Sequence, residues 1–499
     1  MASPVRVLLA RALAAFLTAG LCEAQVPEEL LRGLEDRDPA VRLRAVEALG
    51  DMRAGAETAA PRLGRALEDG DPELRAAAAQ ALGKIGPRAR IAVPALIAAL
   101  RDGHQSVRMH AVWALECMGP DAAAAAPDLL RSLSDEDPRI RENAAAALGR
   151  MEEAARPALG GLIRTLSDGD SFVRLRAAGA LGALGWGDPP VTKALCRSLR
   201  DRHPDVRMAA ADALGKLGAP AQACAAGLLG SLDDEDSYVR TSAARALGRL
   251  RGAAGKSLPR LLKSLLDADT YVRMESASAL GRLGRREPRV SGALALALED
   301  PEPYVRTAAA KALGELRAGD RAAVAALLGL LRDPVPAPRE SAASALKAIG
   351  LREEAALPEL LRALKDPDAS VRMQASSALS SAQELPEGAA ASLGKVLRGE
   401  DPDLRMIAAG ALESMGAKAK SALPDLLRAL RDENPHVRCS AARALGRLGG
   451  EAESSVPELM RSLDDPDVNV RVSAAAALES IRSKTLPRKP QKASSGGGR

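Results

Sequence analysis

Residues Asp432–Gly449 have the sequence DENPHVRCSAARALGRLG, and this pattern returns every 33 residues along the chain. Its central arginine, Arg438, has a counterpart in every copy from Arg42 to Arg471, without one insertion or deletion. Counted from that arginine, every copy has leucine at positions −8 and +7 and alanine at position +6. A fixed period with fixed apolar positions predicts a solenoid, in which each repeat buries its apolar face against its neighbours.

We number the repeats in chain order, from repeat 1 with Arg42 to repeat 14 with Arg471. The second half of each repeat has the pattern of a helix. Position −4 is usually Asp or Asn and position −3 is often Pro, as in Asn434 and Pro435, which is typical of a helix N-cap and a first helical residue. Apolar residues fall at −1, +3, +6, +7 and +10, one stripe of a 3.6-residue period. A frequent glycine at +11, such as Gly449, favours a left-handed C-terminal cap.

A shorter helix is predicted in the first half of each repeat, from about position −17 to −7. Val93–Asp102, VPALIAALRD, is an example, and its proline at −14 can occupy the first turn without losing a hydrogen bond. The sequence shows no alternating strand pattern, and its 1% of aromatic residues is too few for a typical β protein. The predicted fold class is therefore all-α, an α-α superhelix of about fourteen 33-residue, two-helix repeats.

The consensus L-x-D-x-D-P-x-V-R-x-x-A-A-x-A-L-G, as in Leu67–Gly83, resembles the HEAT repeat, in particular the HEAT-like repeat named after phycobilisome lyases. The resemblance covers about residues 26–481. It implies that an Asp and the Arg six residues later hydrogen-bond from one repeat to the next, forming a ladder that fixes the stacking angle. Gly399 is the one departure at the aspartate position. The ladder residues singled out are Asp36, Arg42, Asp69, Arg75, Asp234, Arg240, Asp432 and Arg438.

The two ends of the chain differ from the repeats, which we place at residues 25–481. Residues 1–24 have a basic start, an apolar run and small residues near Ala24, the pattern of a secretory signal peptide; a capping helix is the alternative. We therefore expect a secreted or periplasmic protein, with a cytoplasmic one as the alternative. Residues 482–499 lack an apolar pattern and are predicted to be a disordered basic tail.

The basic charge of the chain resides in this tail. The whole chain has a net charge of +5, the tail has six basic residues and no acidic one, and residues 1–24 add +1, so the repeats carry −2. A solenoid wrapped on nucleic acid would show a basic face. We therefore expect no nucleic-acid binding by the repeats, while binding through the tail stays open as an alternative function.

Between Ser380 and Gly399 the regular pattern is interrupted. The glycines at +8 and +11 and the ladder aspartate are all lost there. This stretch is the candidate for the softest joint of the array. Repeat 10, with three prolines including Pro338 at the usual valine position, is the other irregular unit.

Residue spacing indicates neither catalysis nor metal binding. The four histidines form no His-Glu pairs, which deoxyhypusine hydroxylase, a metal enzyme built from similar repeats, requires. The cysteines of the repeats lie in separate units without metal-ligand spacing, and Cys196 occupies a position that is apolar in most units, so we predict it to be a core residue. We predict no catalytic residue, metal or cofactor. A lyase-like accessory factor that handles a tetrapyrrole is the enzyme-type alternative.

Candidate binding residues come from the second helix of each repeat. Its positions +1, +2, +5 and +9 point away from the core, and in HEAT-like solenoids this helix lines the concave side. Aromatic and arginine side chains at an exposed edge are good anchors for a partner. The predicted partner-binding residues are Phe172, Tyr238, Tyr271 and Tyr304 at position −2, Arg245 at +5, Arg249 and Arg282 at +9, and His110 and Trp113 in repeat 3.

The predicted function is a non-enzymatic interaction scaffold, expected to be monomeric. It binds a protein or peptide on the concave face near repeats 5–9. The aromatic residues at −2 are expected to lie one helix-pair spacing apart in consecutive repeats, about 10 Å.

Overall fold

The structure is a computed structural model that describes residues 26–284, 287–350, 356–380, 385 and 387–485. Every regular element in these residues is a helix, which confirms the predicted all-α class. The chain divides into two compact units, residues 1–260 and 261–499. The predicted signal peptide and residues 486–499 of the predicted tail lie outside the described residues.

In unit 1, each repeat has one long helix, which carries the arginine that recurs every 33 residues, and one short helix before it. The long helices are α3 (Pro39–Asp51), α5 (Pro72–Ile85), α7 (Gln105–Met118), α9 (Pro138–Leu148), α11 (Ser171–Leu184), α13 (Pro204–Leu217) and α15 (Ser237–Arg249). The short helices are α2 (Glu28–Gly33), α4 (Ala60–Ala66), α6 (Val93–Ala99), α8 (Ala126–Ser132), α10 (Leu159–Thr165), α12 (Pro189–Ser198) and α14 (Ala225–Ser231). Stretches of 3₁₀ helix precede most of the short helices: η1 (Arg53–Ala59), η2 (Gly86–Ala92), η3 (Gly119–Ala125), η4 (Glu152–Ala158) and η5 (Ala219–Cys224), with η6 (Arg251–Ala253) at the end of the unit.

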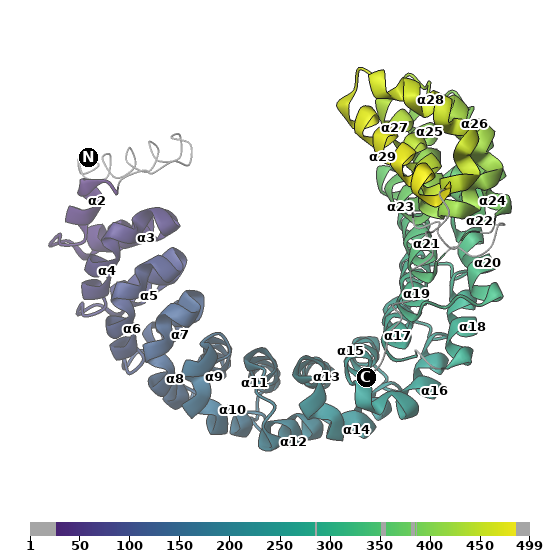
Figure 1. The fold of residues 1–499 in the computed structure, drawn as a ribbon. Helices are drawn as coiled ribbons and strands as arrows, with labels where there is room; N and C mark the ends of the chain where they lie inside the picture. The colour runs from purple at the N-terminus through teal and green to yellow at the C-terminus, as the bar shows by residue number, and fades with distance from the viewer. Residues whose placement is uncertain (1–25, 285–286, 351–355, 381–384, 386, 486–499) are drawn as a thin grey trace, which may run out of the picture. The chain divides into compact units, whose positions relative to one another are not determined.

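The helices of unit 1 form two layers. Figure 1 shows the long helices side by side along the inner edge of an arc and the short helices along its outer edge. Consecutive long helices pack on one another, as α5 does on α7 and α11 on α13. The core of the unit therefore lies between the layers and between successive repeats, as expected for a solenoid.

Unit 2 continues the same helix alternation, and α16 (Ala254–Ser264) contains the division between the units. Its long helices are α17 (Thr270–Leu283), α19 (Pro303–Leu316), α21 (Pro336–Ile349), α23 (Ala369–Ser380), α25 (Pro402–Met415), α27 (Pro435–Leu448) and α29 (Val468–Thr485). The others are α18 (Pro288–Ala297), α20 (Arg321–Leu330), α22 (Ala356–Ala363), α24 (Gly388–Leu397), α26 (Leu423–Ala429) and α28 (Val456–Arg461), with 3₁₀ segments η8 (Gly416–Ala422), η9 (Gly449–Ser455) and η10 (Ser462–Asp464). Long helices again pack in succession, α17 on α19 and α19 on α21.

The start of a long helix follows the predicted capping pattern. In α5, Asp71 Oδ1 accepts a hydrogen bond from the backbone N of Glu73 at 2.9 Å, and Pro72 is the first helical residue. Leu74 and Leu82, at −1 and +7 of this repeat, are almost completely buried. The apolar stripe therefore faces the core from the first turn onward.

Glycine at position +8 sets the spacing of the long helices. A Cβ atom placed on Gly182 in α11 would lie 2.7 Å from Cα of Ala213 in α13. The same atom on Gly446 in α27 would lie 2.8 Å from Cα of Ala477 in α29. Because both distances are far inside van der Waals contact, a larger residue at +8 would push the helices apart.

Helix ends differ from the prediction in two ways. The short helix ends about two residues before the predicted position −7; in repeat 3, α6 begins at Val93, as predicted, and ends at Ala99, position −9. Gly185 has the predicted left-handed conformation, with φ 70° and ψ 9°, but Gly449 combines φ 60° with ψ −132°, a region open mainly to glycine. Gly284 has a negative φ of −85°.

Two predicted boundaries fall near residues that the structure does not describe. Residues 381–384 and 386, within the predicted softest joint, lie outside the described residues; α23 ends at Ser380 and α24 begins at Gly388. The last helix, α29, continues to Thr485, past the predicted start of the tail at residue 482. In repeat 10, Pro338 is buried within the first turn of α21.

Candidate partner-binding surface and the arginine ladder

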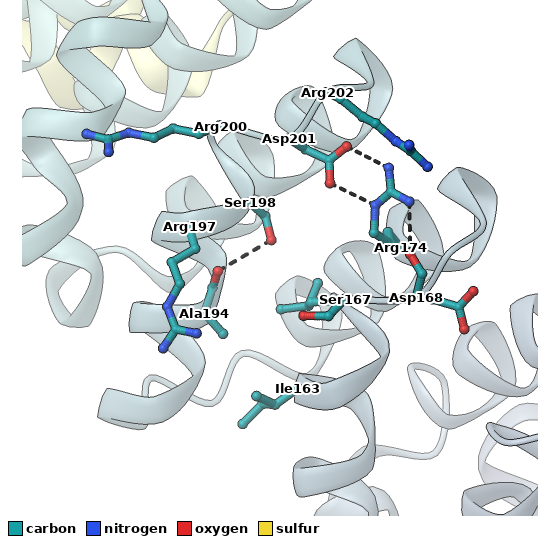
Figure 2. Close-up of a pocket in the computed structure, with 11 residues that line it drawn as sticks. Ile163, Ser167, Asp168, Arg174, Ala194, Arg197, Ser198, Arg200, Asp201 and Arg202 are labelled. Atoms are coloured by element: carbon teal, nitrogen blue, oxygen red, sulfur yellow. Dashed lines mark hydrogen bonds and ion pairs between the residues drawn. The ribbon is translucent and has the colours of Figure 1, made fainter.

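One rung of the ladder is shown in Figure 2, where Arg174 in α11 joins repeats 5 and 6. Its Nε and Nη2 atoms donate to the two carboxylate oxygens of Asp201, both at 2.7 Å. Its Nη1 atom donates to the backbone carbonyls of its own repeat, Asp168 at 2.9 Å and Gly169 at 3.2 Å. Only 6% of the Arg174 side chain is exposed. One guanidinium therefore ties the turn of its own repeat to the turn of the next.

The same rung recurs with a spacing of 27 residues from arginine to aspartate. In unit 1 the further pairs are Arg42–Asp69, Arg75–Asp102, Arg108–Asp135, Arg141–Asp168 and Arg207–Asp234. In unit 2 they are Arg273–Asp300, Arg306–Asp333, Arg339–Asp366, Arg405–Asp432 and Arg438–Asp465. Arg42 and Arg240 also bind the carbonyls of Asp36 and Asp234 in their own repeats, at 3.0 and 2.8 Å.

The aspartates of the ladder also order the turns in which they lie. Asp102 accepts from Arg75 Nε at 2.7 Å and from the backbone N of His104 at 2.8 Å. The hydrogen bond from Arg75 holds the pKa of the Asp102 carboxyl below its usual range. Arg438 lowers the pKa of Asp465 in the same way. These charges are engaged within the array, which gives them a structural role.

Two of the predicted binding residues in unit 1, Phe172 and Tyr238, are exposed at the starts of their helices. Phe172 in α11 is 56% exposed and Tyr238 in α15 is 68% exposed. The backbone N atoms of both residues donate to the capping aspartates Asp170 and Asp236, at 2.8 and 2.9 Å. Their side chains therefore project into solvent from a capped first helical turn.

Unit 2 places four large apolar side chains in solvent within two adjacent repeats. Tyr271 in α17 and Tyr304 in α19 are 57% and 65% exposed. Leu266, in the turn before α17, is 87% exposed, and Leu296 in α18 is 74% exposed. We call these residues the repeat 8–9 apolar set. The two leucines were not predicted, although Leu266 stands at position −7, which is polar or charged in every other repeat.

The predicted basic residues fall into two classes. Arg245 is half-buried and donates to Asp212 in the preceding repeat at 3.2 Å, so its charge is used inside the array. Arg249 in α15 and Arg282 in α17 are exposed near the C-terminal ends of their helices, where a cation is favoured by the helix dipole.

The two predicted binding residues of repeat 3, Trp113 and His110, contact neighbouring parts of the array. Trp113 is half-buried, and a Cβ on Gly83 in α5 would lie 2.4 Å from its indole ring, so the ring packs against this glycine. His110 Nδ1 lies 2.8 Å from the carbonyl oxygen of Ser106 in the same helix. Both side chains therefore have packing partners that position +2 or +5 alone does not reveal.

Two cysteines that the sequence placed in separate repeats are joined. Cys196 in α12 and Cys224 in η5 form a disulfide, with their Cα atoms 5.5 Å apart. Cys196 is therefore a cross-link between repeats 6 and 7 and not simply a core residue. Among the described residues, His, Cys, Asp and Glu form no group of three or more suited to a metal ion. Burial raises the pKa of the Cys117 thiol, which keeps it protonated.

The repeat geometry agrees with a known family. The sequence profile of HEAT repeats matches residues 27–116, 93–168, 159–248, 225–295, 290–380 and 390–479. The chain belongs to the HEAT-repeat family. The finer likeness of these HEAT repeats to the phycobilisome-lyase type stays a prediction. No curated protein sequence matches the chain.

Solved HEAT-repeat structures share the fold at low sequence identity. Kap95p aligns with a TM-score of 0.58 at 14% identity, over 96% of this chain and 74% of that one; in that structure its binding induces the switch loops of RanGDP to adopt the GTP-bound conformation. Importin beta in an ammonium sulfate condition aligns with a TM-score of 0.55 at 16% identity, over 96% and 76%. Kap121p bound to RanGTP gives 0.57 at 15% identity, over 96% and 62%. Within the described residues, no helix is both long enough and apolar enough to cross a membrane.

Proposed function

We propose that this HEAT-repeat protein is a non-enzymatic scaffold that binds a protein or peptide partner through its exposed apolar side chains. The observation that carries the proposal is the repeat 8–9 apolar set, four large apolar side chains that are each more than half exposed in two adjacent repeats. Concentrations of exposed apolar residues on a soluble protein commonly mark interaction sites. Tyrosine at such a site supplies a large contact area with little loss of conformational freedom.

The position of the two tyrosines supports a site at the edge of the inner helices. Tyr271 and Tyr304 lie at the N-terminal ends of α17 and α19, which pack directly on one another. A partner that lies along the concave face would meet both at once. In unit 1, Phe172 and Tyr238 offer the same kind of anchor at the starts of their own helices.

Two observations favour a protein over the alternative partners. The structures with similar folds include Kap121p bound to RanGTP, a HEAT-like array with a protein partner. The repeats carry a charge of −2, whereas a solenoid that wraps nucleic acid would show a basic face. Nucleic-acid binding through the tail and handling of a tetrapyrrole stay secondary hypotheses.

Site-specific photo-crosslinking tests the proposal. Benzoyl-phenylalanine replaces Tyr271 or Tyr304 in the full chain. Ile91, which is 64% exposed and distant from both in the sequence, serves as the matched control position. We expect a discrete protein adduct from positions 271 and 304 in an extract of the native source. An adduct pattern that is the same from position 91 would contradict a specific site.

We also propose that the protein works in an oxidising compartment, outside the cytoplasm. The Cys196–Cys224 pair supports this, because structural disulfides persist in secreted and periplasmic proteins. Mass spectrometry of the alkylated native protein should recover the two cysteines as one linked peptide. Recovery of both as free alkylated thiols would overturn the proposal.

A further inference from the structure

The ladder has a gap between repeats 11 and 12. Arg372 in α23 makes the half of a rung that lies in its own repeat, with Nη1 donating to the carbonyls of Asp366 at 2.7 Å and Pro367 at 2.9 Å. The residue 27 positions later is Gly399, which has no carboxylate. Among the described residues, no carboxylate lies within ion-pair distance of Arg372, and its side chain is exposed.

A second cation in the same place lacks its usual partner. Arg332 and Arg431, at position −7 of their repeats, pair with Glu359 and Glu458 at 27 residues' distance. Lys365 has the same position in repeat 11, but the residue 27 later is Ser392. Lys365 is exposed as well. Both inter-repeat ion pairs are therefore missing at a single junction.

A surface hollow of about 600 Å³ lies at this junction. The hollow is lined by Arg362, Lys365, Gly399 and Glu400, with apolar contributions from Leu361 and Leu404; Arg372 is outside this lining. The adjoining carboxylate of Asp401 is engaged, because it accepts from the backbone N atoms at the start of α25 at 3.0 and 3.3 Å.

Glu400 is an acid of the same junction that could pair with Arg372. It occupies the position from which Glu433 reaches Arg405 at 2.9 Å, 28 residues after the arginine. In this structure Glu400 is exposed and makes no ion pair with Arg372. Its charge competes with any anion that enters the hollow, so its removal is an informative change.

We propose that this junction receives an acidic side chain of the protein partner, an Asp or Glu carboxylate that occupies the place Asp201 has beside Arg174. The carboxylate accepts from Nε and Nη2 of Arg372, and Lys365 neutralises a second acid of the same segment. Arginine suits this role because its planar guanidinium binds a carboxylate through two parallel hydrogen bonds. The inference rests on the proposed scaffold function and adds the chemistry of one contact.

A labelled peptide tests the site without the natural partner. The probe is fluorescein-hexaglutamate, and the measurement is its fluorescence anisotropy with the full chain at low salt. We expect Arg372→Gln to weaken binding about tenfold, the loss of one charged contact. Gly399→Asp should weaken it equally while raising the melting temperature, since it supplies the missing rung; a Cβ there lies 3.1 Å from the Val396 carbonyl, so only a small shift is needed. Glu400→Gln should tighten binding.

Lys347→Gln is the matched control, because it removes one exposed cation from the same unit away from the gap. Its affinity should equal that of the unchanged chain. Binding that Arg372→Gln leaves unchanged, or that Lys347→Gln weakens as much, would overturn the proposal, as would no binding by the unchanged chain. Photo-crosslinking at Tyr271 does not depend on this site, so failure of the peptide assay leaves the scaffold function standing.

Discussion

Arg174→Ala should cost far more stability than Arg372→Ala, although both arginines hold the same place in their repeats. Arg174 loses two bonds to Asp201 and two to backbone carbonyls, in a pair whose side chains are 6% and 12% exposed. Breaking a well-buried ion pair by removing one partner costs about 3–5 kcal/mol. Because Asp201 keeps its hydrogen bond from the backbone N of His203 and is slightly exposed, we expect the lower end, about 3 kcal/mol.

Arg372→Ala removes only two bonds to backbone carbonyls from an exposed side chain, for which about 1 kcal/mol is expected. The difference of about 2 kcal/mol isolates the contribution of the carboxylate to one rung. Both changes place alanine in a long helix, so helix propensity cancels in the comparison.

Urea unfolding gives the free energies, and amide hydrogen exchange at the altered repeats shows whether the loss is local, because repeat arrays need not unfold in one transition. Equal costs for the two variants would refute the claim that the Arg–Asp pairs stabilise the stacking. So would a cost below about 1 kcal/mol for Arg174→Ala, since the backbone bonds alone account for that much.

Four further changes test other parts of the account. Tyr271→Ala should weaken partner binding at least tenfold in a titration with the crosslinked partner and leave the melting temperature unchanged; a drop in that temperature would make it a packing residue. Gly83→Ala should destabilise the protein by about 1–3 kcal/mol in urea unfolding, because the new methyl group meets Trp113; a neutral result would contradict that packing. Stability should fall in acid, because the pKa of Asp102 is lower in the folded protein than in the unfolded chain. The contribution of Asp102 to stability is complete above about pH 4 and is lost as the pH falls through the folded pKa. A melting temperature that stays constant when the pH is taken below about 4 would count against the ladder. Reduction of the Cys196 disulfide, which closes a separation of 28 residues, should cost about 3 kcal/mol, and an unchanged melting temperature under reducing conditions would show that it stabilises nothing.

Much of the fold follows from the sequence because the same helix pattern is present in every repeat. The cap at Asp71 and the buried leucine at Leu82 each have a local physical reason that a single repeat contains. Fourteen copies in phase make the helical period unmistakable. The ladder residues were expected from the resemblance to HEAT-like repeats, which implies that an Asp and the Arg six residues later hydrogen-bond from one repeat to the next.

Apart from the ladder, the side-chain contacts between neighbouring repeats do not follow from the sequence. Trp113 packs on Gly83 and Arg245 pairs with Asp212, and both depend on how neighbouring helices are rotated, which spacing within a repeat does not fix. The disulfide of Cys196 joins positions that are not equivalent in their repeats, so the 33-residue period hides it.

The exposed leucines could have been found by comparing repeats position by position. Leu266 occupies a site that is polar or charged elsewhere, and Leu296 one that is mostly basic. The predicted binding residues came from the second helix of each repeat, and both leucines lie outside that helix.

The central claim, a scaffold that binds a partner through exposed apolar anchors, is tested most directly by affinity capture with the full chain beside a Tyr238/Tyr271/Tyr304→Ala variant. Both proteins are matched for folding by circular dichroism, and bound material is read by quantitative mass spectrometry. The account predicts a protein or peptide that the intact chain retains and the variant loses. Identical bound material on the two proteins, or retention only of nucleic acid or a tetrapyrrole, would contradict it.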